Sequence, residues 1–305
     1  MSYTDHKSFL DAFDKAQRIS LTKTSNRAGL QHLFVYLCCL GGMSCYVAYQ
    51  APFWPVMMVA SGILIAFLFT LQHECTHNTP FRSRWLNTLI GHITGLLLCQ
   101  PFLWFRHFHM AHHRHTNIKG KDPELAGGEK PECWQQFVWH LSTISYWRDK
   151  VVVLWQNATL SSQASYIPKH ARRALQIEAC FMLSFYGVVA GYVMAGHYWI
   201  VTLWLLPLMM GFPFLRLYLL AEHGRCPLVA NMFENTRTVF TNKILCFFTW
   251  NMPYHTEHHI LPAVPFHALP AFHEYTKDSL AVTNDGYYEF VNRYVADFGK
   301  MSGQR

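Results

Sequence analysis

Three short histidine clusters contain the residues of this sequence that are best suited to chemistry. They read HECTH, HMAHH and HTEHH, with the spacings HxxxH, HxxHH and HxxHH. On a helix, residues i, i+3 and i+4 project from one face, so the ring nitrogens of one cluster can converge on one centre. The spacing therefore predicts metal ligation. The predicted ligands are His73 and His77, then His109, His112 and His113, and finally His255, His258 and His259.

The first cluster has a second interpretation when it is taken alone. HECTH is a literal HExxH, which on a helix is the signature of zinc peptidases, with Glu74 as the general base. That interpretation leaves HMAHH and HTEHH without a role, and the sequence has no LDG-type aspartate motif of intramembrane proteases. A membrane zinc metalloprotease is kept as an alternative.

The number of histidines indicates more than one metal ion. A catalytic zinc takes three protein ligands and keeps one position open. The eight imidazoles of the three clusters suit two ions with about four ligands each. Imidazole binds zinc, copper and iron alike, and the order of affinities does not select among them. Redox-inactive zinc would not need so many ligands, so we predict two transition metal ions with redox chemistry.

The composition predicts an integral membrane protein. The 305 residues are 51% hydrophobic and 14% charged, whereas a soluble domain carries about 25% charged residues. No lysine or arginine occurs from Ala28 through Phe81 or from Ala174 through Leu215, which is typical of a membrane protein and excludes a nucleic-acid footprint. Four stretches reach the length of about 20 apolar residues that a span requires. They are residues 31–50, 55–73, 175–195 and 198–220.

The charge distribution also predicts the topology. The spans form two hairpins whose short turns, QAPFWP and AGHYW, contain no basic residue, so the turns face out and both termini face the cytoplasm. His73 and His77 then emerge at the inner end of the second span, and His223 at the inner end of the fourth. Because His223 lies at the same depth as His73, we predict it as a ninth ligand.

The remaining apolar stretches are too short to cross. Residues 85–99 would cover about 22 Å of a hydrocarbon core that is about 30 Å thick, and a crossing there would put the histidine clusters on opposite faces. We therefore expect a helix that lies in or dips into the inner leaflet, with further interfacial helices at 133–160 and 239–250. The predicted fold is an all-α integral membrane protein with four transmembrane helices in two hairpins, interfacial helices and a cytoplasmic histidine-rich cap.

Acidic and amide side chains near the clusters can orient the imidazoles by accepting the second ring N–H. The candidates for this supporting role are Glu74, Asp122, Glu222, Asn251 and Glu257.

The clusters and their surroundings resemble the histidine boxes of integral-membrane fatty-acid desaturases and the related hydroxylases and ketolases. HMAHHRHTNIKGKDPEL, AEHG and NMPYHTEHHILPAVPFHALP are similar to the bacterial branch of that superfamily. The resemblance covers roughly residues 30–275. We accordingly divide the chain into an N-terminal cytoplasmic segment (1–30), a membrane domain (31–275) and a C-terminal cytoplasmic tail (276–305). The motifs are specific for the superfamily and carry no information on chain length or bond position.

The resemblance implies a function and a cofactor. The eight box histidines and His223 would hold two non-haem irons, and O2 would be the co-substrate. The expected reaction is the introduction of a double bond into an acyl chain carried by a lipid, an acyl carrier protein or coenzyme A. Hydroxylation or ketolation of a lipid, carotenoid or other apolar molecule is the alternative, because the same ligands serve both. The electrons would come from a separate donor such as a ferredoxin, and the protein would lie in a bacterial inner membrane with its active site on the cytoplasmic side.

Overall fold

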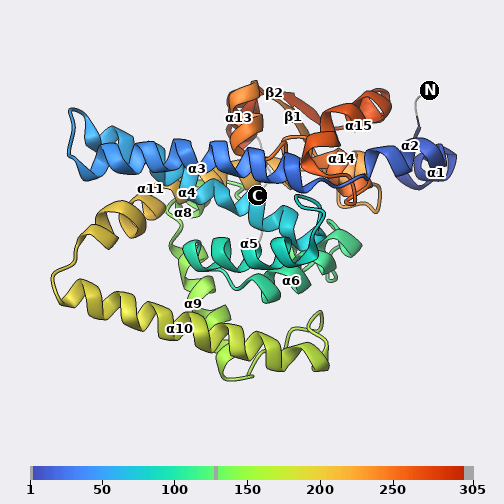
Figure 1. The fold of residues 1–305 in the computed structure, drawn as a ribbon. Helices are drawn as coiled ribbons and strands as arrows, with labels where there is room; N and C mark the ends of the chain where they lie inside the picture. Colours follow the sequence, from blue (N-terminus) through green and yellow to red (C-terminus); the bar gives the residue numbers. More distant parts are fainter. Residues whose placement is uncertain (1–2, 127–129, 299–305) are drawn as a thin grey trace.

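The computed structural model describes residues 3–126 and 130–298 and consists almost wholly of helices (Figure 1). In chain order the elements are α1 (His6–Ala12), α2 (Lys15–Leu21), α3 (Asn26–Ala48), α4 (Trp54–His77), α5 (Arg84–Leu97), α6 (Phe102–His115), α7 (Pro123–Ala126), α8 (Trp134–Leu141), α9 (Ile144–Ala158), η1 (Lys169–Ala171), α10 (Arg172–Met194), the π-helix η2 (Val201–Leu205), α11 (Leu206–His223), α12 (Met232–Asn235), β1 (Thr238–Phe240), α13 (Lys243–Phe248), α14 (His255–Ile260), η3 (Phe266–Ala268), α15 (Leu269–Thr276), η4 (Lys277–Ser279), β2 (Thr283–Asp285) and α16 (Tyr287–Ala296).

Four helical segments within the described residues are long and apolar enough to cross a membrane, which confirms the number of predicted spans. They are Lys15–Ala48, Trp54–His77, Lys169–Met194 and Val201–His223. They form the hairpins α3–α4 and α10–α11, whose turns lie at the same end of the molecule, on the left in Figure 1. The histidine-rich elements α6 and α14 lie toward the other end, as the sequence predicts.

Two helices extend past the predicted ends of their spans. α4 continues to His77, where Asn78 ends it in the left-handed conformation (φ 59°), and α11 continues to His223. The apolar run stops about one turn earlier in each case, but the backbone hydrogen bonds of a helix do not depend on apolar side chains. Because α4 is unbroken, His73 and His77 share one helical face.

The α5–α6 pair enters the apolar layer and returns. The two helices are bent by 103° at their junction. His77, before the pair, and His109, within α6, have their Nε2 atoms 2.8 Å apart. The chain therefore comes back to the end of the molecule that it left, in agreement with the predicted inner-leaflet helix.

Side chains from the second hairpin satisfy the backbone at this bend. The carboxylate of Glu178 on α10 accepts hydrogen bonds from the N–H groups of Phe102 (2.9 Å) and Leu103 (3.0 Å) at the start of α6. The Tyr186 hydroxyl donates to the carbonyl of Leu96 (2.9 Å), at the end of α5. Unpaired backbone groups in an apolar layer cost several kcal/mol each. α10 thus makes the turn between α5 and α6 possible away from water.

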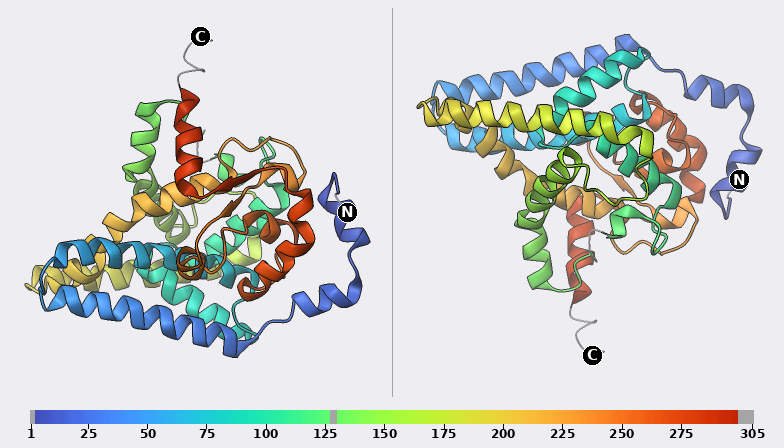
Figure 2. Two further views of the ribbon diagram at one scale, coloured as in Figure 1. Left: turned by 90° about the horizontal axis from the view of Figure 1, so that it is seen from above. Right: turned by 90° about the horizontal axis from the view of Figure 1, so that it is seen from below.

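The C-terminal segment folds back onto the histidine end of the spans. β1 and β2 pair in parallel, with Val239 opposite Asn284, and form the two-stranded sheet. Phe290 and Tyr294 of α16 are buried in a small cluster with Leu220 at the end of α11. In Figure 2, α16 (red, next to the label C) and α8 (green) lie side by side and project away from the long helices. Residues 283–298, in the predicted tail, therefore cover the end of a span.

The crossing of α4 and α11 depends on two glycines. A Cβ atom on Gly211 would overlap the carbonyl oxygen of Gly62, and a Cβ on Gly62 would overlap that of Pro207. Small residues at these positions allow the two backbones to approach closely. Inside a membrane such van der Waals packing drives helix association, because the hydrophobic effect does not.

Gly211→Ala should lower the melting temperature of the detergent-solubilised protein, because the added methyl group forces α4 and α11 apart at a cost of about 1–3 kcal/mol. The matched control is Gly187→Ala on α10, where a Cβ meets no atom within 4 Å. Its melting temperature should stay the same or rise slightly, since alanine favours the helix. A Gly211→Ala protein that melts like the control would contradict the close contact.

Candidate metal centre

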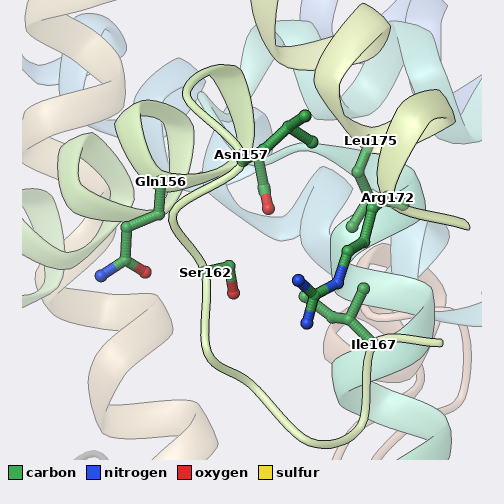
Figure 3. A pocket seen from close by; sticks show the side chains of 7 residues that line it. Gln156, Asn157, Ser162, Ile167, Arg172 and Leu175 are labelled. Atoms are coloured by element: carbon green, nitrogen blue, oxygen red, sulfur yellow. The ribbon is translucent and has the colours of Figure 1, made fainter. Parts of the chain in front are cut away.

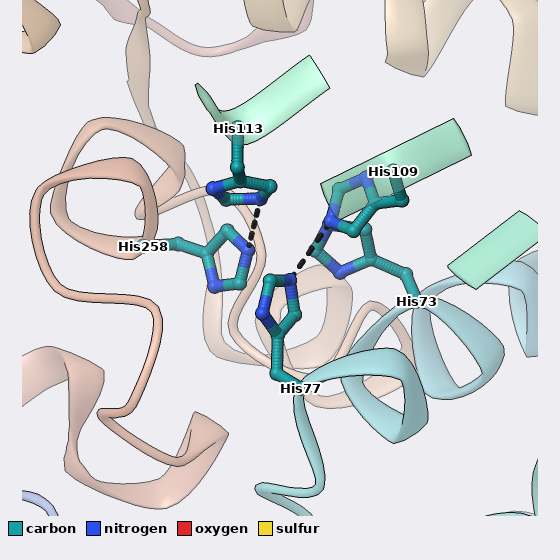
Figure 4. A group of neighbouring side chains, drawn as sticks. All are labelled: His73, His77, His109, His113 and His258. Carbon is teal, nitrogen blue, oxygen red and sulfur yellow. Dashed lines mark hydrogen bonds between the residues drawn. The ribbon is translucent and has the colours of Figure 1, made fainter. Parts of the chain in front are cut away.

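All nine predicted histidine ligands meet at one place, where α4, α6, α11 and α14 come together. Five of them have ligand atoms within 4.8 Å of one another (Figure 4). This first group consists of His73, His77, His109, His113 and His258. His112, His223 and His259 form a second group by the same criterion. The Nε2 atom of His255 lies 3.0 Å from that of His223 and 3.1 Å from that of His259, so His255 belongs with the second group.

Each HxxHH cluster is divided between the two groups, which differs from the expectation that one cluster converges on one centre. His109 and His113, four residues apart on α6, face the first group, while His112 faces the second. On α14 the division is reversed, since His258 faces the first group and His259 the second. Adjacent residues of a helix point about 100° apart. The paired histidines at the end of HxxHH can therefore serve two neighbouring centres.

The ring nitrogens of the histidines are arranged in a way that suits metal ligation. The Nε2 atoms of His113 and His258 are 3.2 Å apart, and those of His112 and His223 are also 3.2 Å apart. His73 is 5% exposed, and among the described residues neither of its ring nitrogens has a hydrogen-bond partner. A buried polar group without a partner is rare in folded proteins, and a bound ion is one of its ordinary explanations. The imidazole set suits transition metals such as iron, zinc or copper.

In three histidines of the second group, the outer ring nitrogen, Nδ1, which points away from the other imidazoles, lies within hydrogen-bond distance of an oxygen atom. His112 Nδ1 lies 3.0 Å from an Asp122 carboxylate oxygen, and His223 Nδ1 lies 3.1 Å from the main-chain carbonyl of Asn235. The Thr116 hydroxyl donates to the carbonyl of His112 (2.8 Å), so it can accept from His259 Nδ1 at 3.1 Å. These contacts place the proton on Nδ1 and leave the Nε2 lone pair facing the centre.

The predicted supporting residues are found in two different places. Asp122 contacts His112 as described, Glu222 lies 3.5 Å from Nδ1 of His255, and Glu74 lies 3.6 Å from Nδ1 of His258. Glu257 and Asn251 instead make hydrogen bonds within the C-terminal segment that follows α12. The Glu257 carboxylate accepts from Thr238 and contacts His273, and the Asn251 amide donates to the carbonyl of Phe266.

Three contributors were not predicted from the sequence. Glu124 is the first, with its carboxylate 3.5 Å from Nδ1 of His112. Thr116 follows His112 by four residues on the same helical face, which is a local signal that could have identified it. Asn235 contributes a main-chain carbonyl, for which no residue type gives a signal. Its side chain donates to the carbonyl of Thr116 (3.0 Å), so it also joins α12 to the end of α6.

The buried environment keeps most of these imidazoles neutral. Burial, and then the neighbouring imidazoles, hold the pKa of His109, His113 and His258 well below the ordinary value of 6.5. Their lone pairs are therefore available for metal ions at neutral pH. His112 is the exception, because the carboxylates of Glu124 and Asp122 outweigh the effect of burial and raise its pKa. The second group thus lies closer to negative charge than the first.

Comparison with known proteins supplies the family and several relatives. A family model described as fatty acid desaturase matches residues 49–290. The sn-1 oleoyl-lipid 12-desaturase of Anabaena variabilis is 28% identical over 107 residues, which are 30% of this chain and 31% of that protein. The enzyme of the same name from Picosynechococcus sp. is 34% identical over 84 residues (26% of this chain, 24% of that protein). The sn-1 acyl-lipid omega-3 desaturase (ferredoxin) of Nostoc sp. is 33% identical over 64 residues (21% and 18%). The matched segments span less than a third of each relative's length.

Asp122→Asn should weaken metal binding by about 10–100-fold, because an amide cannot hold the Nδ1 proton of His112 as a carboxylate does. The measurement is competition with a chelator on the purified full chain. Asp149→Asn is the control, since Asp149 is half-exposed and pairs with Arg148. Equal metal retention by the two variants would remove Asp122 from the site.

Proposed function

The chain belongs to the fatty acid desaturase family, and on that premise we propose that it is an O2-dependent membrane oxidoreductase that introduces a double bond into an acyl chain. The nine histidines of the two groups are the proposed ligands of a pair of non-haem irons. When bound, the irons would supply the oxidising power that breaking an unactivated C–H bond requires.

The observation that carries this proposal is the arrangement of nine imidazoles, seven of them buried and two partly buried, in two adjoining groups, one of five and one of four counting His255. A zinc hydrolase would use three protein ligands at one ion. The two groups adjoin instead, since the rings of His113 and His259 stack with centroids 4.0 Å apart, so ions held by the groups would be neighbours. The contacts of Asp122, Asn235 and Thr116 hold three of these imidazoles in the orientation that ligation requires.

The position of Glu74 argues against the peptidase alternative. Its carboxylate is fully buried, accepts from the N–H of Phe266 (3.2 Å) and the hydroxyl of Thr79 (3.0 Å), and faces the outer nitrogen of His258. A general base must instead lie within hydrogen-bond reach of the proton that it removes. Glu74 therefore connects α4 to Phe266 and to the imidazole of His258.

The surroundings of the first group suit an apolar substrate. The ring of Phe105 stacks on His109 with centroids 5.5 Å apart, and Phe69 lies 6.4 Å from His73. Both phenylalanines are buried, and both lie on helices that enter the apolar layer. Such a wall excludes water from the reacting carbon and so limits side reactions of activated oxygen. The substrate we propose is an acyl chain on a lipid, in line with the printed names of the relatives.

The electron donor and the side of the membrane are also part of the proposal. We take the donor to be a separate ferredoxin-like carrier, supported by the name of the relative from Nostoc sp.. We place the metal centre and both termini on the cytoplasmic side of a bacterial inner membrane. The absence of lysine and arginine from both hairpin turns supports this orientation.

Expression of the chain in an aerobic bacterial host with a reduced ferredoxin system should give lipids whose acyl chains have lost two hydrogens. Mass spectrometry of the extracted lipids measures this change. His258→Ala should abolish the product, because His258 is fully buried in the first group. His197→Ala is the control, since His197 is exposed in the turn of the second hairpin.

Metal analysis of the same preparations distinguishes the outcomes. The wild type and the control should hold about two irons per chain, and His258→Ala should hold fewer. Acyl chains that gain an oxygen atom would assign the protein to the hydroxylases or ketolases. A single tightly held zinc would overturn the iron assignment.

Glu74→Gln should reduce desaturation by about 10–100-fold, as expected for a residue that orients a ligand. A peptidase would lose nearly all its activity with the same substitution, because its general base would be gone. The glutamine keeps one oxygen to accept from Phe266, so the fold should persist, and circular dichroism checks this. Complete loss of turnover with normal iron content would give Glu74 a direct part in the reaction.

A further inference from the structure

A polar hollow lies beside the metal centre and is not used by the proposed reaction. It has a volume of about 440 Å³ and is formed by the residues after α11, by β2 and by α16. Ligand pockets of proteins fall in the same range, about 300–1,000 Å³. Three arginines line it, Arg225, Arg237 and Arg293, against the single carboxylate of Asp297. The hollow is therefore a large site with an excess of positive charge.

Two of these guanidinium groups have buried N–H donors without an acceptor. Arg237 is 6% exposed and donates to the carbonyls of Ala221 and Gly224 at the end of α11. Among the described residues its Nε–H has no partner. Arg225 donates through Nη1 to Asp297 (2.8 Å), while its Nη2, also buried, has no acceptor within the described ranges. These two donor atoms are covered by surrounding protein, so a ligand in the hollow meets the other parts of the arginine side chains that line it.

The form of the donors indicates which acceptor fits. Guanidinium is planar, stays charged and presents paired N–H groups that match the oxygens of a phosphate. The Arg225 guanidinium lies 4.2 Å above the Tyr294 ring, which fixes its plane. Arg293 is 70% exposed and pairs with Glu289, so it can turn toward a ligand at the rim. A phosphate group in the hollow could accept from Arg293 and from the exposed part of Arg225, and it would balance the positive charge.

The hollow lies at the depth of lipid headgroups. Its lining begins at Gly224, the residue that follows the span Val201–His223. α8 packs against α16 with the rings of Phe137 and Tyr294 at 6.3 Å, and it exposes Trp134 and Trp139. Exposed tryptophans are typical of the boundary between acyl chains and headgroups. Figure 2 shows α8 and α16 together on one side of the long helices.

A second hollow in the molecule does not share these properties. It lies between the end of α9 and the start of α10, with Asn157 and Arg172 pointing into it (Figure 3). Its volume of about 10 Å³ suits a single water molecule. Of these two hollows in the described part of the chain, the one at α16 has the space for a phosphate.

We propose that the hollow lined by Arg225, Arg237 and Arg293 binds the phosphate of an anionic phospholipid headgroup. Such a lipid fastens α16 and the β1–β2 pair to the end of α11, directly after His223. The site is separate from the metal ligands, so lipid binding can be measured whether or not the protein desaturates acyl chains.

The test uses the purified full chain in detergent micelles with phosphatidylglycerol or with phosphatidylcholine of the same acyl chains. Native mass spectrometry counts the lipids that each chain retains. The wild type should retain phosphatidylglycerol at about tenfold lower lipid concentration than phosphatidylcholine, because both lipids carry a phosphate but the choline cation cancels its charge and is repelled by the arginines. The double variant Arg225→Gln/Arg293→Gln should lose this preference. Arg148→Gln, which removes an exposed arginine on α9, should keep it.

Two further measurements make each outcome decisive. Arg293→Gln alone removes only an exposed ion pair and should not affect the melting temperature, so it replaces the double variant if that protein unfolds. Inorganic phosphate at the same concentration as the lipid is added to a parallel sample. Displacement of phosphatidylglycerol by inorganic phosphate at equal concentration would show a site for a soluble phosphate and overturn the lipid assignment. Unchanged lipid preference in the arginine variants would overturn the site itself.

Discussion

The convergence of buried imidazoles on one place, where water cannot hydrogen-bond to them, governs how the surrounding helices pack. Nine histidines lie together at one end of the spans. Seven of them are 5% exposed or less, and His77 and His113 are partly buried. Each ring has an inner nitrogen that faces the other imidazoles. Where the outer nitrogen is satisfied, it meets a carboxylate, a hydroxyl or a main-chain carbonyl. Helices α4, α6, α11 and α14 have to converge for these contacts to exist.

The convergence requires the chain to turn inside an apolar layer. α6 can reach the end of α4 only because α5 and α6 are bent by 103°. The exposed backbone of that bend is satisfied by Glu178 and Tyr186 from α10, and by Trp204, whose indole donates to the carbonyl of Leu97 (2.8 Å). The second hairpin therefore does more than cross the membrane. It provides the hydrogen bonds that let the histidines of α6 return to the site.

The C-terminal segment completes the site from outside. Arg237, just before β1, donates to two carbonyls at the end of α11, where the helix dipole favours a cation. The same helix end carries His223, so the position of that imidazole depends on residues from β1. α16 then covers Leu220 through Phe290 and Tyr294. A ligand in the adjoining hollow would act on the same helix end that carries His223.

Spacing, apolar length and charge distribution are local properties of the chain, so they predict the nine histidines, the four spans and the end of the molecule at which the histidines meet. The sequence also identified Asp122, Glu74 and Glu222 as neighbours of the imidazoles. The tertiary structure alone decided how each HxxHH is divided between two groups, since His112 meets His223 across 111 positions of the chain. It also decided the contribution of the Asn235 carbonyl and the arginine hollow. These depend on which helix ends are packed together, and helical periodicity carries no information about that.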